Sequence, residues 1–129
     1  MPVKHLTLQG FKEHIFDFES GKDWEFQGSL PAIIDFYADW CGPCKAVAPV
    51  LEELSDVYDG RIDFYKIDTD KETELSTLFG IQSIPTFLFL PLTGDPMLQR
   101  GAFPKNVFVE IIETRLLAEQ PVDSNEDGE

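Results

Sequence analysis

The chain has 129 residues, with 24 acidic and 10 basic side chains and a formal net charge of −14. This length supports one hydrophobic core but hardly two, and the acidity argues against nucleic acid or an anionic membrane as the main partner. Two cysteines are too few for a disulfide scaffold. We therefore expect one globular domain at residues 1–119, followed by an acidic, flexible tail at residues 120–129.

The sequence shows neither the features of a signal peptide nor those of a membrane span. The N-terminal residues lack the basic start and apolar stretch of a signal peptide, and no apolar run approaches membrane-spanning length. The sequence predicts a soluble cytoplasmic protein. A periplasmic protein whose signal peptide has been removed is the alternative.

The N-terminal segment predicts a strand followed by a helix. Residues 3–8 alternate enough for a strand, and within residues 11–18 Phe11, Ile15 and Phe18 recur at helical spacing. A βα start is therefore expected.

A long loop is predicted at residues 19–31, where glycine, proline and charged residues are mixed. It carries two aromatic residues, Trp24 and Phe26. Large aromatics pack more often than they bind, so we favour a structural role, with a docking surface as the alternative.

A buried strand and an amphipathic helix flank the two cysteines. Residues 32–38 form a nearly continuous apolar run with one acid, which is typical of a strand covered on both faces. The helix that follows ends at Asp59-Gly60. Its apolar positions follow helical periodicity: Val47, Val50, Leu51, Leu54, Val57 and Tyr58.

The rest of the chain completes a βαβαβαββα order, which predicts an α/β fold with a mixed sheet and helices on both faces. A strand is expected at 61–70, a helix at 71–80, a buried strand at 86–90, an antiparallel strand at 97–103 and a final helix opening at Pro104. The inward side of that helix comprises Val107, Phe108, Ile111, Ile112 and Leu116.

Both cysteines fall at the junction between the buried strand and the amphipathic helix. Cys41 lies beside the helix N-terminus, whose free N–H groups and dipole favour a thiolate. We therefore predict that Cys41 is an exposed nucleophile and that Cys44, one turn further on, resolves the mixed disulfide. Gly42 permits close approach of a partner, and Pro43 suits the first helical turn.

A metal site is the less favoured explanation of the cysteine pair. The histidines, His5 and His14, lie upstream at no standard zinc spacing. We predict no metal ligand.

The stretch WCGPCK at residues 40–45 resembles the active-site signature of the thioredoxin family. The similarity extends over residues 3–118 with the elements in family order. Further matches are Asp35 to the buried acid, Lys66 to the lysine near it, Pro49 to the helix-kinking proline, SIPT (83–86) to the cis-proline loop and Gly101 to the groove glycine. The position two residues after the acid, commonly tryptophan, is Tyr37 here.

The resemblance implies a thioredoxin fold with a five-stranded sheet and a protein-disulfide reductase that uses dithiol–disulfide exchange. Asp35 would accept a proton behind Cys44, and Lys66 would help to set its charge. No bound cofactor is implied beyond the Cys41–Cys44 disulfide, which a thioredoxin reductase or an equivalent donor would recycle. Substrates would be disulfide-containing proteins, bound by a monomer in a groove formed by Trp40, Gly42, Pro43, Ile84, Pro85, Gly101 and Ala102.

Alternatives remain for the protein and for single residues. On the same fold the protein could be an envelope oxidase or isomerase, although the Gly-Pro dipeptide resembles the reducing members, or a non-catalytic docking subunit. Asp35 or Lys66 could simply face solvent, and Trp40 could belong to the core.

Overall fold

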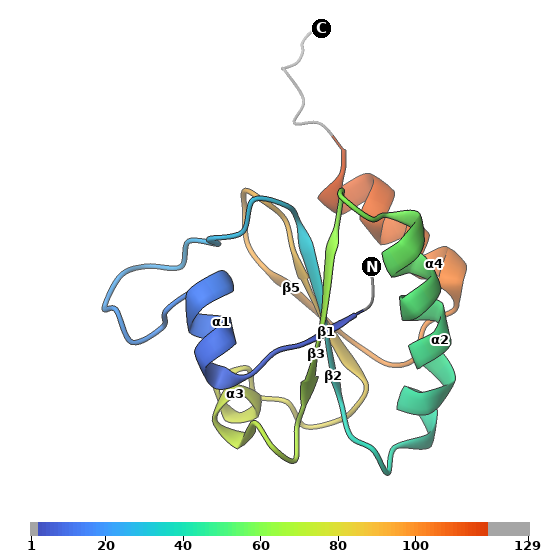
Figure 1. Cartoon of the computed structure of the whole chain (residues 1–129), viewed down its shortest axis with the longest axis horizontal. Helices are drawn as coiled ribbons and strands as arrows, with labels where there is room; N and C mark the ends of the chain where they lie inside the picture. Colours follow the sequence, from blue (N-terminus) through green and yellow to red (C-terminus); the bar gives the residue numbers. More distant parts are fainter. Residues whose placement is uncertain (1–2, 119–129) are drawn as a thin grey trace, which may run out of the picture.

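The computed structural model describes residues 3–118 (Figure 1). Its elements, in chain order, are β1 (Lys4–His5), α1 (Leu8–His14), β2 (Ala32–Tyr37), α2 (Gly42–Val57), β3 (Asp63–Asp68), α3 (Thr73–Leu78), β4 (Thr86–Leu90), β5 (Met97–Arg100), α4 (Lys105–Ile111) and the π-helix η1 (Ile112–Leu116).

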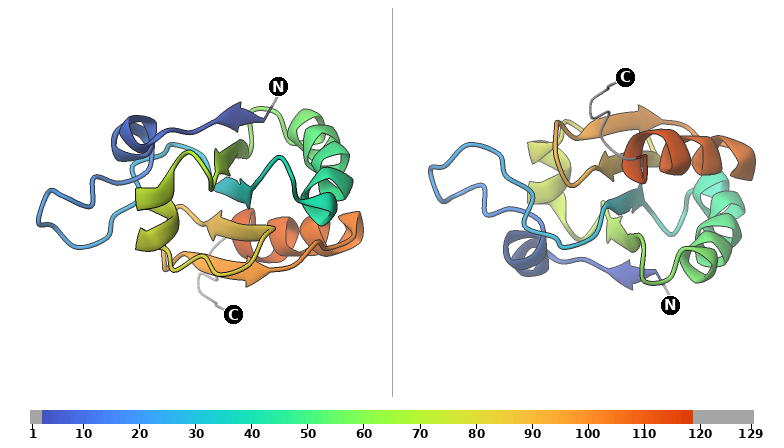
Figure 2. Two further views of the ribbon diagram at one scale, coloured as in Figure 1. Left: turned by 90° about the horizontal axis from the view of Figure 1, so that it is seen from below. Right: turned by 90° about the horizontal axis from the view of Figure 1, so that it is seen from above.

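A single five-stranded sheet with the order β1-β3-β2-β4-β5 forms the middle layer. Strands β1, β3 and β2 are parallel, whereas β4 runs antiparallel to β2 and to β5. Helices α1 and α3 cover one face, and α2 and α4 cover the other (Figures 1 and 2). The predicted α/β fold with a mixed sheet is confirmed.

Strand β2 lies at the centre of this arrangement and contributes to both cores. Ile33 packs in the core under α2 and α4, whereas Ile34 packs in the core under α1 and α3. Successive strand side chains point to opposite faces, so the continuous apolar run of β2 reflects burial on both sides. The strand leads directly to the cysteines.

The N-terminal elements differ from the prediction. Strand β1 covers only Lys4–His5, because Thr7 is the N-cap of α1 and its side chain accepts the Gly10 N–H at 3.1 Å. The predicted strand at 3–8 and helix at 11–18 are therefore wrong in their boundaries. A capping threonine stabilises a helix start by about 1 kcal/mol, and the weak alternation before it does not outweigh this.

The loop after α1 projects beyond that helix (Figure 2). Trp24 packs on Phe16 with ring centroids 5.1 Å apart, and both Trp24 and Phe26 lie against the core under α1 and α3. The Phe26 ring covers Gly28 so closely that a Cβ there would lie 2.3 Å from a ring carbon. The structural role favoured for these aromatics is confirmed.

Four of the six apolar positions predicted for α2 are buried, Val50 is partly buried, and Val57 is exposed. Val57 is 60% exposed, so its predicted inward position is wrong. At 100° per residue, Val57 lies roughly 80° from Val47 around the helix, at the margin of the stripe. Its buried positions are Val47, Leu51, Leu54 and Tyr58.

The C-terminal elements are shorter than expected. Strand β5 ends at Arg100 rather than at 103, because Gly101 turns the chain with φ of 109°. Strand β3 and helix α3 also lie inside the predicted ranges 61–70 and 71–80.

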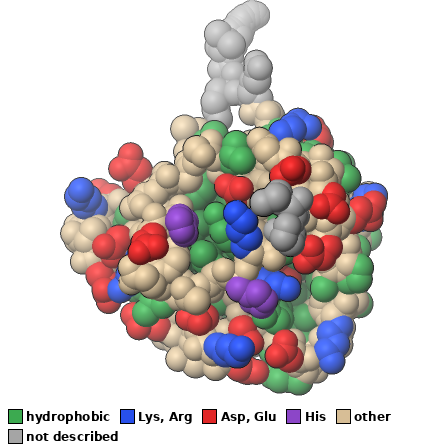
Figure 3. All heavy atoms as spheres, viewed as in Figure 1, with side chains coloured by type: hydrophobic (Ala, Val, Ile, Leu, Met, Phe, Trp, Pro, Cys, Tyr) green, Lys and Arg blue, Asp and Glu red, His purple; other side chains and the backbone are tan. Residues whose placement is uncertain are grey.

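Helix α4 begins after Pro104, as expected, and continues as the unexpected π-helix η1. The predicted tail at 120–129 lies outside the described residues. Within residues 3–118, none of the helices is long and apolar enough to cross a membrane. Acidic side chains are spread over the face shown in Figure 3, with lysines and arginines between them.

Candidate active site

The cysteine pair lies at the N-terminal end of α2 as a disulfide, with Cα atoms 5.3 Å apart. Cys41 is the N-cap of the helix, and its Sγ accepts the Cys44 N–H at 3.2 Å. Pro43 occupies the first turn. The positive end of the helix dipole therefore lies at Cys41, as the sequence predicted, and it favours a thiolate there after reduction.

Both cysteine side chains are buried, which was not expected for Cys41. Cys41 is 4% exposed and Cys44 3% exposed, so the prediction of an exposed Cys41 is wrong for this oxidised form. Ala38 forms a cluster with them, and the partly buried Tyr37 and Ile84 pack against it. Neighbouring side chains therefore cover most of the disulfide in this form.

Trp40 provides the largest exposed apolar surface beside the disulfide, at 70% exposed. This excludes the alternative in which Trp40 belongs to the core. Its indole Nε1 donates a hydrogen bond to Asp70 Oδ2 at 2.9 Å, and the Asp70 N–H donates to Asp68 Oδ1 at 2.9 Å. Asp70 was not singled out from the sequence, because nothing local in TDKE indicates contact with a residue 30 positions away.

The loop before β4 closes another side of the site. The Ile84-Pro85 bond is cis, as the resemblance implied. The Ile84 carbonyl oxygen lies 3.8 Å from Cys41 Sγ, and within residues 3–118 the Ile84 N–H has no hydrogen-bond partner. Gly101 adjoins this loop, because its N–H donates to the Pro85 carbonyl at 2.9 Å. Ala102 follows as an exposed residue.

Asp35 lies behind Cys44, on the face of β2 toward α2. It is 4% exposed, and its Oδ1 has no hydrogen-bond partner within the described part of the chain. Burial raises its pKa to about 7, although the positive charge of Lys66 acts in the opposite direction. The solvent-facing alternative for Asp35 is therefore wrong.

A cavity of about 180 Å³ joins these groups, and Asp35, Cys44 and Lys66 all line it. Lys66 is half-buried on β3 and is the register partner of Asp35 on β2. The structure thus brings the predicted acid, lysine and second cysteine together. The spacing of Asp35 and Lys66 in the sequence does not predict this proximity, because the proximity depends on the register between β2 and β3.

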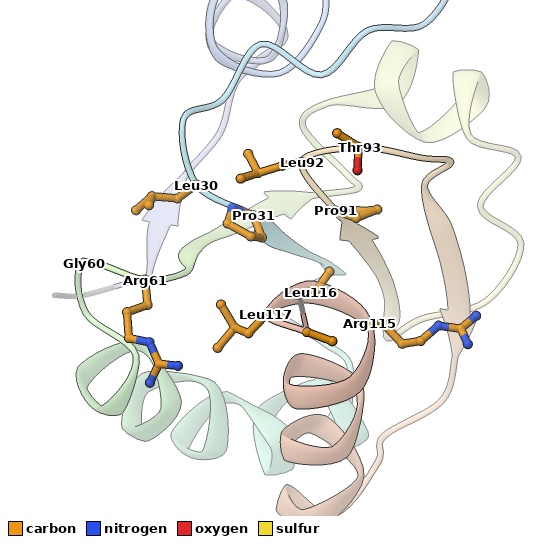
Figure 4. Close-up of a pocket in the computed structure, with 11 residues that line it drawn as sticks. Leu30, Pro31, Gly60, Arg61, Pro91, Leu92, Thr93, Arg115, Leu116 and Leu117 are labelled. Atoms are coloured by element: carbon orange, nitrogen blue, oxygen red, sulfur yellow. The ribbon is translucent and has the colours of Figure 1, made fainter. Parts of the chain in front are cut away.

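A larger cleft of about 510 Å³ lies at the opposite end of α2, where the loops before β2 and after β4 meet η1 (Figure 4). Leu92 and Leu117 point toward its interior, Leu30 lines one edge, and Arg61 and Arg115 lie on opposite rims. Among residues 3–118, its lining includes no cysteine, histidine or carboxylate side chain. Within residues 3–118 there is also no group of three or more His, Cys, Asp or Glu side chains suited to a metal.

The chemistry of the site is that of dithiol–disulfide exchange. A cysteine pair at a helix N-terminus can alternate between dithiol and disulfide, and a buried carboxyl beside the second sulfur can exchange a proton with it. This α/β fold and this site define a thiol–disulfide oxidoreductase.

Comparisons with known proteins agree with that assignment. The family model for thioredoxin matches residues 3–114. The chain is 50% identical over 107 residues to thioredoxin of Borreliella burgdorferi, covering 83% of this chain and 92% of that protein. It is 33% identical over 111 residues to thioredoxin 1 of a Nostoc species, covering 86% and 94%.

A solved structure shows the same fold. The crystal structure of chloroplastic thioredoxin z superimposes with a TM-score of 0.73 at 28% identity, covering 87% of this chain and 92% of that one. The chain belongs to the thioredoxin family. It is a protein-disulfide reductase whose redox group is its own cysteine pair.

Proposed function

We propose that Cys41 is the attacking cysteine and Cys44 the resolving one. The Cys41 thiolate attacks one sulfur of a substrate disulfide, forming a mixed disulfide while the other substrate sulfur leaves as a thiolate. The Cys44 thiolate then attacks Cys41 Sγ, and the first substrate sulfur leaves. The substrate gains two electrons and two protons, and the Cys41–Cys44 disulfide remains.

Asp35 accepts the proton of Cys44 in the second step. The observation that carries this assignment is the buried carboxyl of Asp35, with one oxygen unpartnered, in the same cavity as Cys44. With a pKa of about 7, the carboxyl is near half ionisation at neutral pH, where a proton acceptor works best. Lys66 favours the ionised form of Asp35.

The substrate docks in a groove around Cys41. Exposed Trp40 supplies an apolar wall, and the unpartnered Ile84 N–H is available to a substrate backbone in a strand-like arrangement. The groove residues are those expected from the sequence: Trp40, Gly42, Pro43, Ile84, Pro85, Gly101 and Ala102.

The reduced form is regenerated by an external reductase, such as a thioredoxin reductase, that supplies two electrons to the Cys41–Cys44 disulfide. Disulfide-containing proteins are the substrates, and the protein acts as a monomer in the cytoplasm. Homologues named thioredoxin support the general class of partners. A strongly reducing potential of the cysteine pair is expected for this role, and an oxidising one for an oxidase.

Trapping tests the assignment of the two cysteines. Incubation of C44S with a disulfide-containing protein should accumulate a covalent adduct at Cys41, detectable by mass spectrometry and released by dithiothreitol. The matched variant C41S should form much less of this adduct. Normal turnover by C44S, or equal trapping by both variants, contradicts the proposal.

A further inference from the structure

Three polar residues form a row across the sheet beside the active site. His5 on β1 is the register partner of Lys66 on β3, and Lys66 is the register partner of Asp35 on β2. Register partners in neighbouring strands place their side chains on the same face. The row therefore runs from exposed His5 through half-buried Lys66 to buried Asp35.

Tyr37 lies beside this row and contacts both Lys66 and His5. It follows Asp35 by two residues on β2, so both side chains leave the same face of the strand. Lys66 Nζ lies 5.8 Å from the centroid of the Tyr37 ring, and the Tyr37 hydroxyl lies 3.4 Å from His5 Nδ1. Tyr37 also packs against the cysteine cluster and lines the cavity of Asp35 and Cys44.

These contacts restrict a side chain that is otherwise flexible. A lysine ammonium moves freely on its four-carbon stem, whereas an aromatic face within 6 Å attracts it. Both Tyr37 and Lys66 line the cavity into which Asp35 projects. The Tyr37 ring thus restrains the Lys66 ammonium near the cavity, where its positive charge acts on the Asp35 carboxyl.

We propose that Tyr37 is a positioning residue for the exchange reaction: its ring holds the Lys66 ammonium beside the cavity, where the positive charge favours the carboxylate form of Asp35. This inference rests on the proposed role of Asp35 as the proton acceptor of Cys44. It assigns to Tyr37 a function beyond packing.

The charges around Asp35 determine the direction of the effect. Burial raises the pKa of Asp35 to about 7, and Lys66 is the group that lowers it. The other titratable groups that face this region are Cys44 and Lys45 on α2, Asp39 after β2, Asp68 on β3 and His5 on β1. Release of Lys66 from the ring should therefore raise the pKa of Asp35 further.

The experiment compares Y37L, which removes the aromatic face, with the matched control Y37F, which keeps it. The titration of the Asp35 carboxyl is followed by carbon NMR in the reduced protein. Y37L should raise the midpoint by about 0.5 pH unit, a roughly twofold loss of carboxylate at neutral pH. Y37F should stay within about 0.2 pH unit of the parent. An unshifted Y37L, or equal shifts in both variants, overturns the proposal.

A second arm tests whether Tyr37 acts through Lys66. In a K66M background, Y37L should produce no further shift of the Asp35 midpoint, because the ammonium is already gone. An equal shift with and without Lys66 shows that Tyr37 acts only by packing or desolvation, and it overturns the inference. K66M keeps a long apolar stem, so it removes the ammonium but preserves most of the packing. The comparison of K66M with K66M/Y37L therefore tests the charge even if the single variants lose some stability.

The pH profile of the resolving step separates the inference from the proposed function. Y37L should slow that step about twofold near pH 7, and its rate should approach the parent rate above pH 9. If D35N resolves at the parent rate, the role of Asp35 fails and the inference fails with it. If D35N is slow but Y37L matches the parent at every pH, only the inference about Tyr37 fails.

Discussion

Helix α2 has an open volume at each end, and the two differ in size and in chemistry. At its N-terminal end, about 180 Å³ is lined by Asp35, Cys44 and Lys66. At its C-terminal end, about 510 Å³ is lined mainly by leucine and proline, with arginines on the rims. Only the smaller of these two volumes places a buried carboxyl with an unpartnered oxygen beside the disulfide.

The largest expected contrast between the two ends concerns turnover. The double variant C41S/C44S should catalyse disulfide reduction at least about 1,000-fold more slowly than the parent. No residue at the other end of α2 can act as the nucleophile in place of Cys41. L92S at the far cleft, where Leu92 is 48% exposed, should leave turnover within about twofold of the parent. Insulin reduction with an electron donor measures both.

The same double variant also tests the docking-subunit alternative. If a partner that depends on this protein retains its function with C41S/C44S, the exchange chemistry is not the physiological role. Loss of that function together with turnover supports the reductase.

The second prediction concerns the stability of the native state at the cysteine end. Because folding raises the pKa of Asp35 from its ordinary 3.8 to about 7, the native state binds this proton more tightly than the unfolded chain. The contribution is fully present below about pH 4 and is lost as the pH rises through 7. D35N should therefore increase the free energy of unfolding at pH 8 by about 2–4 kcal/mol.

Denaturant titrations at pH 4 and pH 8 measure this effect on the oxidised protein. The gain of D35N over the parent should disappear at pH 4, where Asp35 is protonated in the native state. A gain of the same size at both pH values would mean that the carboxyl does not titrate as described.

The third prediction concerns stability at the cleft end. Leu116 is 7% exposed and belongs to the core under α2 and α4. L116A should lower the free energy of unfolding by about 2–3 kcal/mol, without changing turnover at temperatures where the protein remains folded. A selective loss of turnover in the folded variant would show that the two ends of α2 are coupled.

The smallest expected effect comes from Asp70. D70A removes the acceptor of the Trp40 indole N–H and should leave the Trp40 side chain less ordered in the groove. We expect KM to rise about threefold with kcat unchanged, because an exposed hydrogen bond contributes only about 1 kcal/mol. D95A, on an exposed turn away from the site, serves as the charge-matched control, and equal KM values in both variants would contradict the role.

The fold was predictable because its signals are local and consistent. The buried run of β2, the stripe of α2 and the motif at residues 40–45 each indicate the same arrangement. The start of α1 was missed because a single capping residue, Thr7, determines it. The π-helix η1 was missed because its apolar spacing resembles that of an ordinary helix end.

The residues of the proposed site can be named from the sequence, but their contacts cannot. Cys41, Cys44 and Asp35 were identified by position and by resemblance, whereas the burial of Cys41 depends on Tyr37 and Ile84 from other segments. The link from Trp40 to Asp70 likewise depends on how the β3–α3 loop packs. Contacts across strands and loops are set by tertiary packing, which a single sequence does not encode in its spacing.

The two tryptophans occupy very different surroundings, and this gives the protein two optical reporters. Trp40 adjoins the disulfide and is largely exposed, whereas Trp24 packs on Phe16 in the loop beyond α1. In W24F the remaining fluorescence comes from Trp40, so its intensity follows the redox state and the arrival of a substrate. In W40F the remaining fluorescence comes from Trp24, so it follows unfolding around α1 independently of the redox state.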